Sequence, residues 1–166
     1  MPFRHFERLL GLLCEWAKEQ ERIVCKSGIP LDQSQLADAK EIGVVEPERV
    51  RLLEVKHIPV PAHSELHTTI KTPGLNFSNH LGLTVRYGIF LRSDKWSDRP
   101  LLRHKLAHTS QYERLGSFEL FLRLYLFECL FQPGYPYGFL EKEAKRAEWA
   151  PLNRINLKRK LQPCGD

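Results

Sequence analysis

The chain has 166 residues, of which 42% are hydrophobic and 27% are charged. This length predicts one domain over residues 1–166, large enough to bury its own core. Ten Gly and eleven Pro are ordinary numbers and exclude collagen-like and low-complexity architectures. The 25 Lys and Arg exceed the 20 Asp and Glu by five, but the cations are scattered among anions. We therefore expect no nucleic-acid partner, although the charge permits one.

The apolar segments and the cysteines indicate a cytoplasmic protein. The N-terminal apolar run of residues 9–14 stops at Glu15 and is short for a signal peptide. No segment approaches the ~20 apolar residues that span a bilayer, so we expect no membrane association. No two cysteines have C-x-x-C spacing, which favours free thiols over a zinc knuckle or a disulfide framework. The four cysteines are Cys14, Cys25, Cys129 and Cys164.

The first 49 residues form a predicted helical part. Apolar residues recur at spacings of three and four over residues 3–25, which predicts an amphipathic helix. Gly28 is expected to end it in a left-handed C-cap, and Pro30 blocks its continuation. A second helix is predicted from its N-cap Asp32 to Gly43, followed by a turn at 46–48.

Residues 50–92 are predicted to contain the strands. Residues 50–58 form one strand, which ends before Pro59. The following region, 59–82, is irregular, with a weak strand around residues 66–71. Residues 83–91 are predicted as a single strand with alternate side chains on one face. A polar turn is expected at 93–98.

The C-terminal half is predicted to be helical. Helices are expected at 100–114, 117–131 and about 139–149, with a break at Pro133 and Gly134. The second helix is apolar nearly all round and is expected to be central to the core. Residues 150–166 form a basic tail that we expect to be solvated. This order of helices, strands and helices predicts an α+β domain.

The residues with the clearest chemistry are His104 and His108. They are four apart on a predicted helix, so both imidazoles lie on one face and can share a tetrahedral metal ion. In the H-E-x-x-H motif of metallopeptidases, Glu follows the first His and acts as the general base. Lys105 stands at that position here. An isolated pair of histidines at this spacing is also common on solvated or core helix faces.

Three pieces of the chain together resemble a family of small bacterial zincin-like metallopeptidases. The helix matches L-x-x-H-E-L-x-H-x-x-Q-Y-x-R-x-G except at Lys105. The preceding segment resembles G-x-T-x-x-x-x-I-x-x-R, and a G-Y…E-x-E-A element follows the helix. The resemblance covers roughly residues 50–149. It implies a zincin-like single domain in which a small mixed or antiparallel sheet packs on helices that include the metal-motif helix. The residues that carry it are Leu101, His104, Leu106, His108, Gln111, Tyr112, Arg114, Gly116, Gly82, Thr84, Ile89, Arg92, Gly134, Tyr135, Glu141, Glu143 and Ala144.

The resemblance implies zinc as the cofactor and a third ligand from the E-x-E-A helix. By analogy with zincins whose ligand Glu lies on such a helix, we favour Glu141. Glu143 is the alternative, since two carboxylates two residues apart on a helix point in different directions and only one can be the ligand. Gln111, Tyr112 and Tyr135 are expected to orient the ligands or contact a substrate. A solvated helix face for the two carboxylates, and simple packing for the tyrosines, remain the plain alternatives.

Lys105 occupies the position that determines the mechanism. An ammonium neither accepts a proton nor attracts a divalent cation, so the resemblance implies a metallopeptidase relative whose hydrolysis is impaired or lost. Zinc binding can survive this change. A neutral Lys105 acting as the base would need its pKa lowered by roughly three units. An ion pair between Lys105 and Glu141 that replaces the metal is a further alternative.

Two further classes of function stay open at this stage. A non-catalytic module could bind a peptide or protein by adding a strand along residues 83–91. The tail cations Arg154, Lys158, Arg159 and Lys160 could contact nucleic acid, but a solvated tail is the simpler interpretation. The substrate and the oligomeric state do not follow from the sequence.

Overall fold

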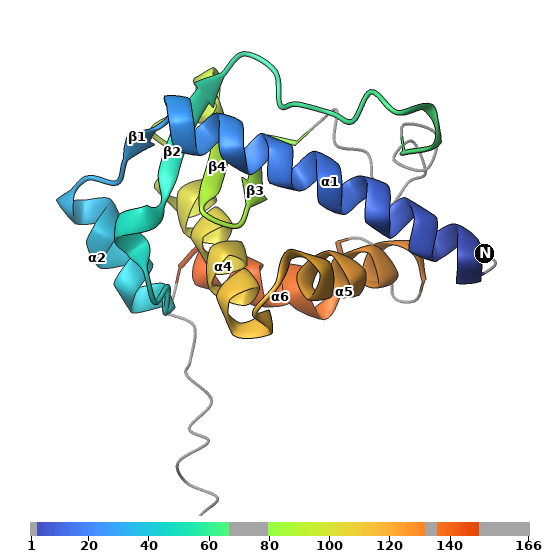
Figure 1. Ribbon diagram of the computed structural model, residues 1–166. Helices are drawn as coiled ribbons and strands as arrows, with labels where there is room; N and C mark the ends of the chain where they lie inside the picture. The colour runs from blue at the N-terminus through green and yellow to red at the C-terminus, as the bar shows by residue number, and fades with distance from the viewer. Residues whose placement is uncertain (1–2, 67–79, 132–135, 150–166) are drawn as a thin grey trace, which may run out of the picture.

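The computed structural model describes residues 3–66, 80–131 and 136–149, and these parts combine α-helices with a small sheet (Figure 1). Two 3-10 helices, η1 (Pro47–Arg49) and η3 (Ser93–Lys95), occupy the turns predicted at 46–48 and 93–98. The mixed α+β class predicted from the order of elements is confirmed. In chain order the helices and strands are α1 (Phe3–Ser27), β1 (Ile29–Pro30), α2 (Gln33–Ile42), β2 (Arg51–Val55), β3 (Gly82–Val85), β4 (Gly88–Arg92), α4 (Arg99–Leu115), α5 (Phe118–Leu130) and α6 (Phe139–Ala147).

In the part of the chain that the structure describes, the sheet has four strands in the order β1-β2-β4-β3. Strands β2 and β4 are parallel, with Leu52 opposite Ile89, and the two outer pairs are antiparallel. The sheet is therefore mixed, and β3 forms one of its edges.

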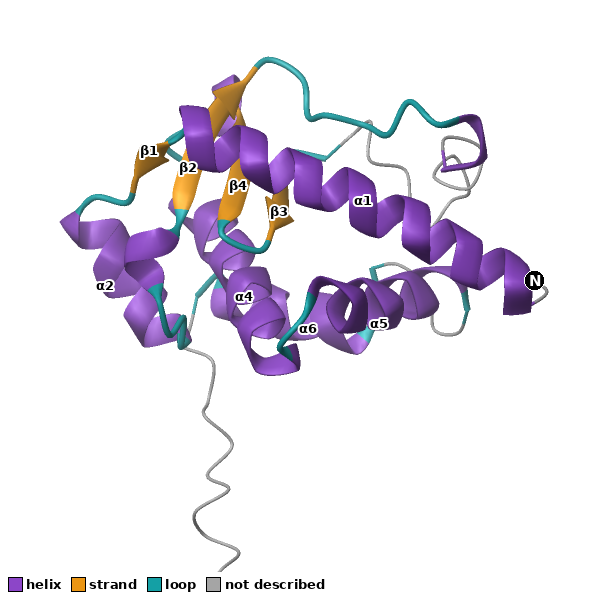
Figure 2. Ribbon diagram, viewed as in Figure 1, coloured by secondary structure: helices purple, strands orange, loops and turns teal. Residues whose placement is uncertain are grey.

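Helices cover both faces of this sheet (Figure 2). Side chains alternate between the faces along a strand, and β4 shows this alternation clearly. Phe90 belongs to the apolar cluster that includes α1 and α5, whereas Ile89 and Leu91 belong to the cluster of α2, α4 and α6. Helix α4 is thus held between the sheet and the C-terminal helix.

Local capping signals explain where the helices end. Asp32 caps α2 through the amide of Gln35, and Gly43 ends that helix in the left-handed region, as predicted. Gly28 does not adopt the predicted left-handed conformation, because its φ angle is not positive. A side chain at Gly28 would collide with the carbonyl oxygens of Val24 and Leu52, so this glycine allows β1 to approach β2 closely.

The prediction of one strand over residues 83–91 is wrong. Strands β3 and β4 form an antiparallel hairpin, and Arg86 in its turn has a φ of 56°. The carboxylate of Glu21 in α1 accepts both Arg86 Nε and Nη2 at 2.8 Å and also the amide of Tyr87 at 3.2 Å. A contact across 65 positions of the chain therefore fixes a turn whose two central residues, Arg86 and Tyr87, are neither Gly nor Asn.

Helix α5 is less central than its composition predicts. Its Phe118, Phe121 and Leu126 are buried, but Leu120 and Phe127 are 52% and 51% exposed. It therefore packs on the core by one face only. None of the described helices combines the length and the apolar character that crossing a bilayer would require.

Several predictions fall on residues outside the described parts. These include most of the weak strand at 66–71, the break at Pro133 and Gly134, Tyr135, Cys164 and the basic tail. The other three cysteines are free thiols, as predicted.

Candidate metal centre

Helix α4 holds His104 and His108 on the face that looks toward α6. Asp98 caps the helix through the amide of Leu101 at 3.0 Å, and Gly116 ends it in the left-handed region. Two threonines fasten the helix to the β3–β4 hairpin. Thr84 donates to the carbonyl of Lys105 at 3.0 Å, and Thr109 donates to the carbonyl of Arg86 at 2.8 Å.

Helix α6 supplies the third side chain, Glu141. The residue before the helix is Gly138, which has no side chain to cap it. The carboxylate of Glu128 in α5 takes this role and accepts the amide of Leu140 at 3.1 Å. A Cβ at Gly138 would collide with Glu128, so the glycine makes room for the cap. The start of α6, and with it Glu141, is therefore positioned by α5.

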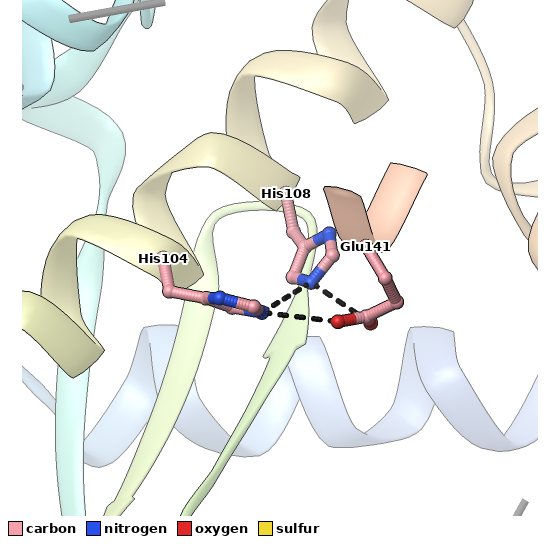
Figure 3. Close-up of side chains that lie close together, drawn as sticks. All are labelled: His104, His108 and Glu141. Carbon is pink, nitrogen blue, oxygen red and sulfur yellow. Dashed lines mark hydrogen bonds and ion pairs between the residues drawn. The ribbon is translucent and has the colours of Figure 1, made fainter. Parts of the chain in front are cut away.

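The three side chains point at one another (Figure 3). The Nε2 atoms of His104 and His108 are 3.2 Å apart. Each of them lies 3.3 Å from an oxygen of Glu141, Oε2 for His104 and Oε1 for His108. All three side chains are nearly buried. Of the described residues, these are the ones that form a cluster able to hold a metal ion.

Hydrogen bonds on the far side of each imidazole fix its tautomer. The Gln111 amide donates through Nε2 to Leu140 O at 3.0 Å and to Glu143 Oε2 at 2.8 Å. Its Oε1 therefore faces His108 Nδ1 at 2.8 Å, and that nitrogen must be the donor. His104 Nδ1 likewise donates to a carboxylate oxygen of Glu148 at 3.1 Å. In the neutral rings, both Nε2 atoms then carry lone pairs.

Three acceptors consequently converge on one point without a hydrogen between them. Lone pairs at 3.2–3.3 Å repel unless a cation lies among them. A tetrahedral zinc ion with bonds of 2.0–2.2 Å needs ligand atoms about 3.3–3.6 Å apart. The two imidazole nitrogens are 3.2 Å apart, each lies 3.3 Å from a different oxygen of Glu141, and one ligand atom of each residue lies within 4.8 Å of the others. Two imidazoles with one carboxylate are a donor set that zinc accepts. The residues present thus fit a zinc ion.

Burial sets the charge of the cluster. Removal from water lowers the pKa of His104 from 6.5 to about 4, so this imidazole is neutral at pH 7. Burial alone would raise the pKa of Glu141. Interactions with His108 and His104, with a smaller effect of Lys105, outweigh it and hold the pKa well below its usual range. Glu141 is therefore an ionised carboxylate at neutral pH, beside the neutral imidazole of His104.

Lys105 lies beside the cluster without joining it. No described residue forms a hydrogen bond or ion pair with its ammonium. The alternative in which a Lys105–Glu141 ion pair takes the place of the metal is therefore wrong for the described residues. Burial lowers the pKa of Lys105, and the carboxylates of Glu141 and Glu148 act in the opposite direction. The side chain crosses β3 at Gly82, where an added Cβ would lie 3.2 Å from Lys105 Cε.

A pocket of about 470 Å³ opens on one side of the cluster. His104, Lys105 and Glu141 form part of its wall. Small-molecule sites in proteins commonly have volumes of ~300–1,000 Å³. The other lining residues are His80, Leu81, Leu101, Pro136, Tyr137, Lys142, Lys145 and Glu148.

The remaining predicted site residues occupy different surroundings. Glu143, the alternative ligand, pairs with Arg114 at 2.5 and 2.8 Å, accepts a hydrogen bond from Gln111 and is outside the three-residue cluster. Gln111 contacts His108, as described above. Tyr112 is buried and stacks on Phe121, with 3.7 Å between the ring centroids. Tyr135 lies outside the described residues, and Tyr137 lines the pocket.

Sequence reasoning missed three residues of the site. Glu148, which fixes His104, follows Glu141 by seven positions and thus lies on the same side two helical turns later, a spacing that could have revealed it. Tyr125 donates to Glu141 Oε1 at 2.7 Å from α5. His80 lines the pocket, and burial lowers its pKa from 6.5 to about 4. No sequence signal points to Tyr125 or His80, because their contacts come from tertiary packing.

Comparison with known proteins identifies no relative of the chain. No family model, curated protein or solved structure matches it.

Proposed function

We propose that the protein binds a zinc ion through His104, His108 and Glu141. The observation that carries the proposal is the convergence of two imidazoles and one carboxylate, with ligand atoms within 4.8 Å of one another, on a point where a zinc ion would fit. The hydrogen bonds to Gln111 and Glu148 support it, because ligand histidines usually donate their other nitrogen to such partners. Zinc would supply a Lewis acid at the wall of the pocket.

We also propose that this centre belongs to a zincin-like protein that has lost peptide hydrolysis. In such a centre the residue after the first histidine removes a proton from the attacking water, and Lys105 is a cation there. Each of the three proposed ligands has a partner that holds it in place: Tyr125 donates to Glu141, His104 donates to Glu148, and His108 donates to Gln111. Support for the zincin-like assignment is the resemblance of the motifs together with this geometry.

Metal analysis tests the zinc proposal directly. Protein supplied with zinc and then dialysed is expected to retain one equivalent, and H104A and E141A are expected to retain none. H80A is the matched control, because His80 lines the same pocket but is outside the three-residue cluster. Equal zinc contents in wild type, H104A and E141A would exclude the site.

A peptidase assay tests the loss of hydrolysis. Wild-type protein loaded with zinc is expected not to cleave a generic unfolded protein substrate, and K105E is the variant in which cleavage could return. Cleavage by the wild type that H104A abolishes would instead establish an active peptidase with an unusual base.

Peptide binding along β3 is a second candidate function. In the described part of the chain β3 pairs with β4 only, and its Gly82 adjoins the pocket through Lys105. An extended peptide could add to this edge through backbone hydrogen bonds. Amide chemical-shift changes confined to β3 on titration with extended peptides would support this function, and their absence would argue against it.

A further inference from the structure

The Lys105 ammonium is placed to meet a ligand rather than a protein carboxylate. Its side chain crosses β3 at Gly82, and it shares the wall of the 470 Å³ pocket with His104 and Glu141. Within the described residues no carboxylate oxygen lies within 4.0 Å of its nitrogen. Thr84 binds only its backbone carbonyl. The cation is therefore held beside the metal centre by its backbone and its stem, with its donors directed to no protein group.

The chemistry of this group differs from that of a general base in one decisive way. An ammonium has three donors and no acceptor, so it complements an oxyanion. A carboxylate at the same position would repel such a group. The replacement that argues against hydrolysis therefore favours the binding of an anion at the same place.

The other charges around the pocket point to the same ligand class. Lys145 is paired with Glu148 at 2.8 Å, so these two charges largely cancel. Glu141 balances only one of the two charges of a zinc ion. Lys105 and Lys142 add positive charge, and neither has a carboxylate partner within the parts of the chain that the structure covers. With the metal bound, the pocket is positively charged.

We propose that the pocket binds a small anionic ligand whose carboxylate or phosphate group lies between the metal and the Lys105 ammonium. This inference rests on the zinc site proposed above and names the class of molecule that the site takes. The volume of the pocket suits a small molecule. Leu81, Leu101 and Tyr137 offer apolar surface for the rest of such a ligand.

Cobalt(II) in place of zinc gives a spectroscopic test that does not depend on catalysis. Its visible spectrum responds to a change of ligand in the metal's coordination sphere. We would titrate the cobalt protein with acetate and, separately, with inorganic phosphate at constant ionic strength, so that screening does not change. The wild type is expected to show a saturable spectral change, and the anion that binds more tightly identifies the preferred group.

Variants of Lys105 separate its role from that of the metal. K105M keeps the length of the stem but removes the charge, and its anion affinity is expected to fall at least about tenfold, as for a charge-assisted hydrogen bond. K40M removes an exposed lysine that pairs with Glu48 away from the pocket, and should behave as wild type. K105Q is the second variant if K105M does not fold. An anion-free cobalt spectrum like that of the wild type verifies that the site is intact in each variant.

The outcomes distinguish this inference from the metal site itself. A wild-type cobalt spectrum that neither anion changes would overturn the inference and leave the metal site standing. Equal anion affinities in wild type and K105M would also overturn it, because the metal alone would then account for anion binding. Absence of any bound cobalt would refute the metal site, and the inference would fall with it.

Discussion

Helix α4 carries two buried polar clusters on neighbouring faces, and they are built in opposite ways. On one face, the Arg103 guanidinium donates to Asp38 at 2.5 Å, to Glu41 at 2.9 Å and to the carbonyl of Ala147 at 2.9 Å. On the next face, His104, His108 and Glu141 turn acceptor atoms toward one another without a cationic side chain bonded among them. Arg103 thus belongs to a closed network, in which donors meet acceptors. The adjacent His104 belongs to an open network, in which acceptors face one another.

The difference lies in the balance of donors and acceptors. Arg99 completes the first cluster with two bonds of 2.7 Å to Asp38, so every charged group there meets its complement. In the second cluster, the outer nitrogens of both histidines are satisfied by Glu148 and Gln111, and Tyr125 donates to one oxygen of Glu141, but the two inner Nε2 atoms face each other and the carboxylate. The first network stabilises the fold without a ligand, because its donors and acceptors match. The second is completed only when a cation from solution binds among its acceptors.

Breaking the closed network should cause the largest loss of stability. In D38A the buried Arg103 loses its main partner, and an uncompensated buried charge costs about 3–5 kcal/mol. The free energy of unfolding, measured with urea on metal-free protein, is the readout. E41A is the matched control, because Glu41 is half exposed and its pair with Arg103 is worth at most about 1 kcal/mol. Similar losses in both variants would contradict the assignment of Asp38 as the central partner.

Filling the open network should stabilise the protein by a comparable amount. Zinc at a free concentration 1,000-fold above its dissociation constant adds about 4 kcal/mol to the stability of the folded state. The midpoint of thermal unfolding is expected to rise with zinc in the wild type and in D38A, but not in H104A. A rise of equal size in H104A would place the zinc elsewhere.

Removing the support of one ligand should weaken the metal site without abolishing it. E148A deprives His104 Nδ1 of its acceptor, and the zinc affinity is expected to fall about 10–100-fold. Competition with a chromophoric chelator measures this change. K145A is the control, since it removes the partner of Glu148 and leaves the bond to His104 in place. If the zinc affinity fell as much in K145A as in E148A, the affinity would depend on the charge of the Lys145–Glu148 pair rather than on the orientation of His104.

The smallest effect concerns pH between 7 and 4, where the two networks should differ. The hydrogen bond from Arg99 holds the pKa of Asp38 below its usual 3.8, against the opposing effect of burial. The contribution of Asp38 to stability is therefore full above pH 3.8 and is lost only as the pH falls through the lower folded value. The stability difference between wild type and D38A should stay constant from pH 7 to 4. The stabilisation by zinc should instead decline as the pH approaches 4, because protons then compete for the lone pair of His104, whose pKa is about 4.

Features that depend on local chemistry follow from the sequence. The caps Asp32 and Gly43 delimit α2, and the predicted helix at 100–114 corresponds closely to α4. The four-residue spacing of His104 and His108 places both rings on one face because the helix period alone requires it. These inferences need no knowledge of the rest of the chain.

Features that depend on distant partners do not follow from it. The turn at Arg86 is held by Glu21 from α1, so the local pattern of residues 83–91 resembles one continuous strand. The exposed side of α5 carries Leu120 and Phe127, which hydrophobicity alone places inside. The choice of Glu141 over Glu143 was made from a resemblance, and here it is the partner Arg114 that draws Glu143 away.

Gln111 gives the molecule one further property. A single side-chain amide both fixes which nitrogen of His108 carries the proton and ties α4 to the backbone of α6 at Leu140. Rotating that amide by half a turn would present donors to a donor and an acceptor to two acceptors. The position of the proton on His108 and the packing of α6 against α4 are therefore coupled. A ligand that changes the protonation of His108 also changes the hydrogen bond between Gln111 and α6.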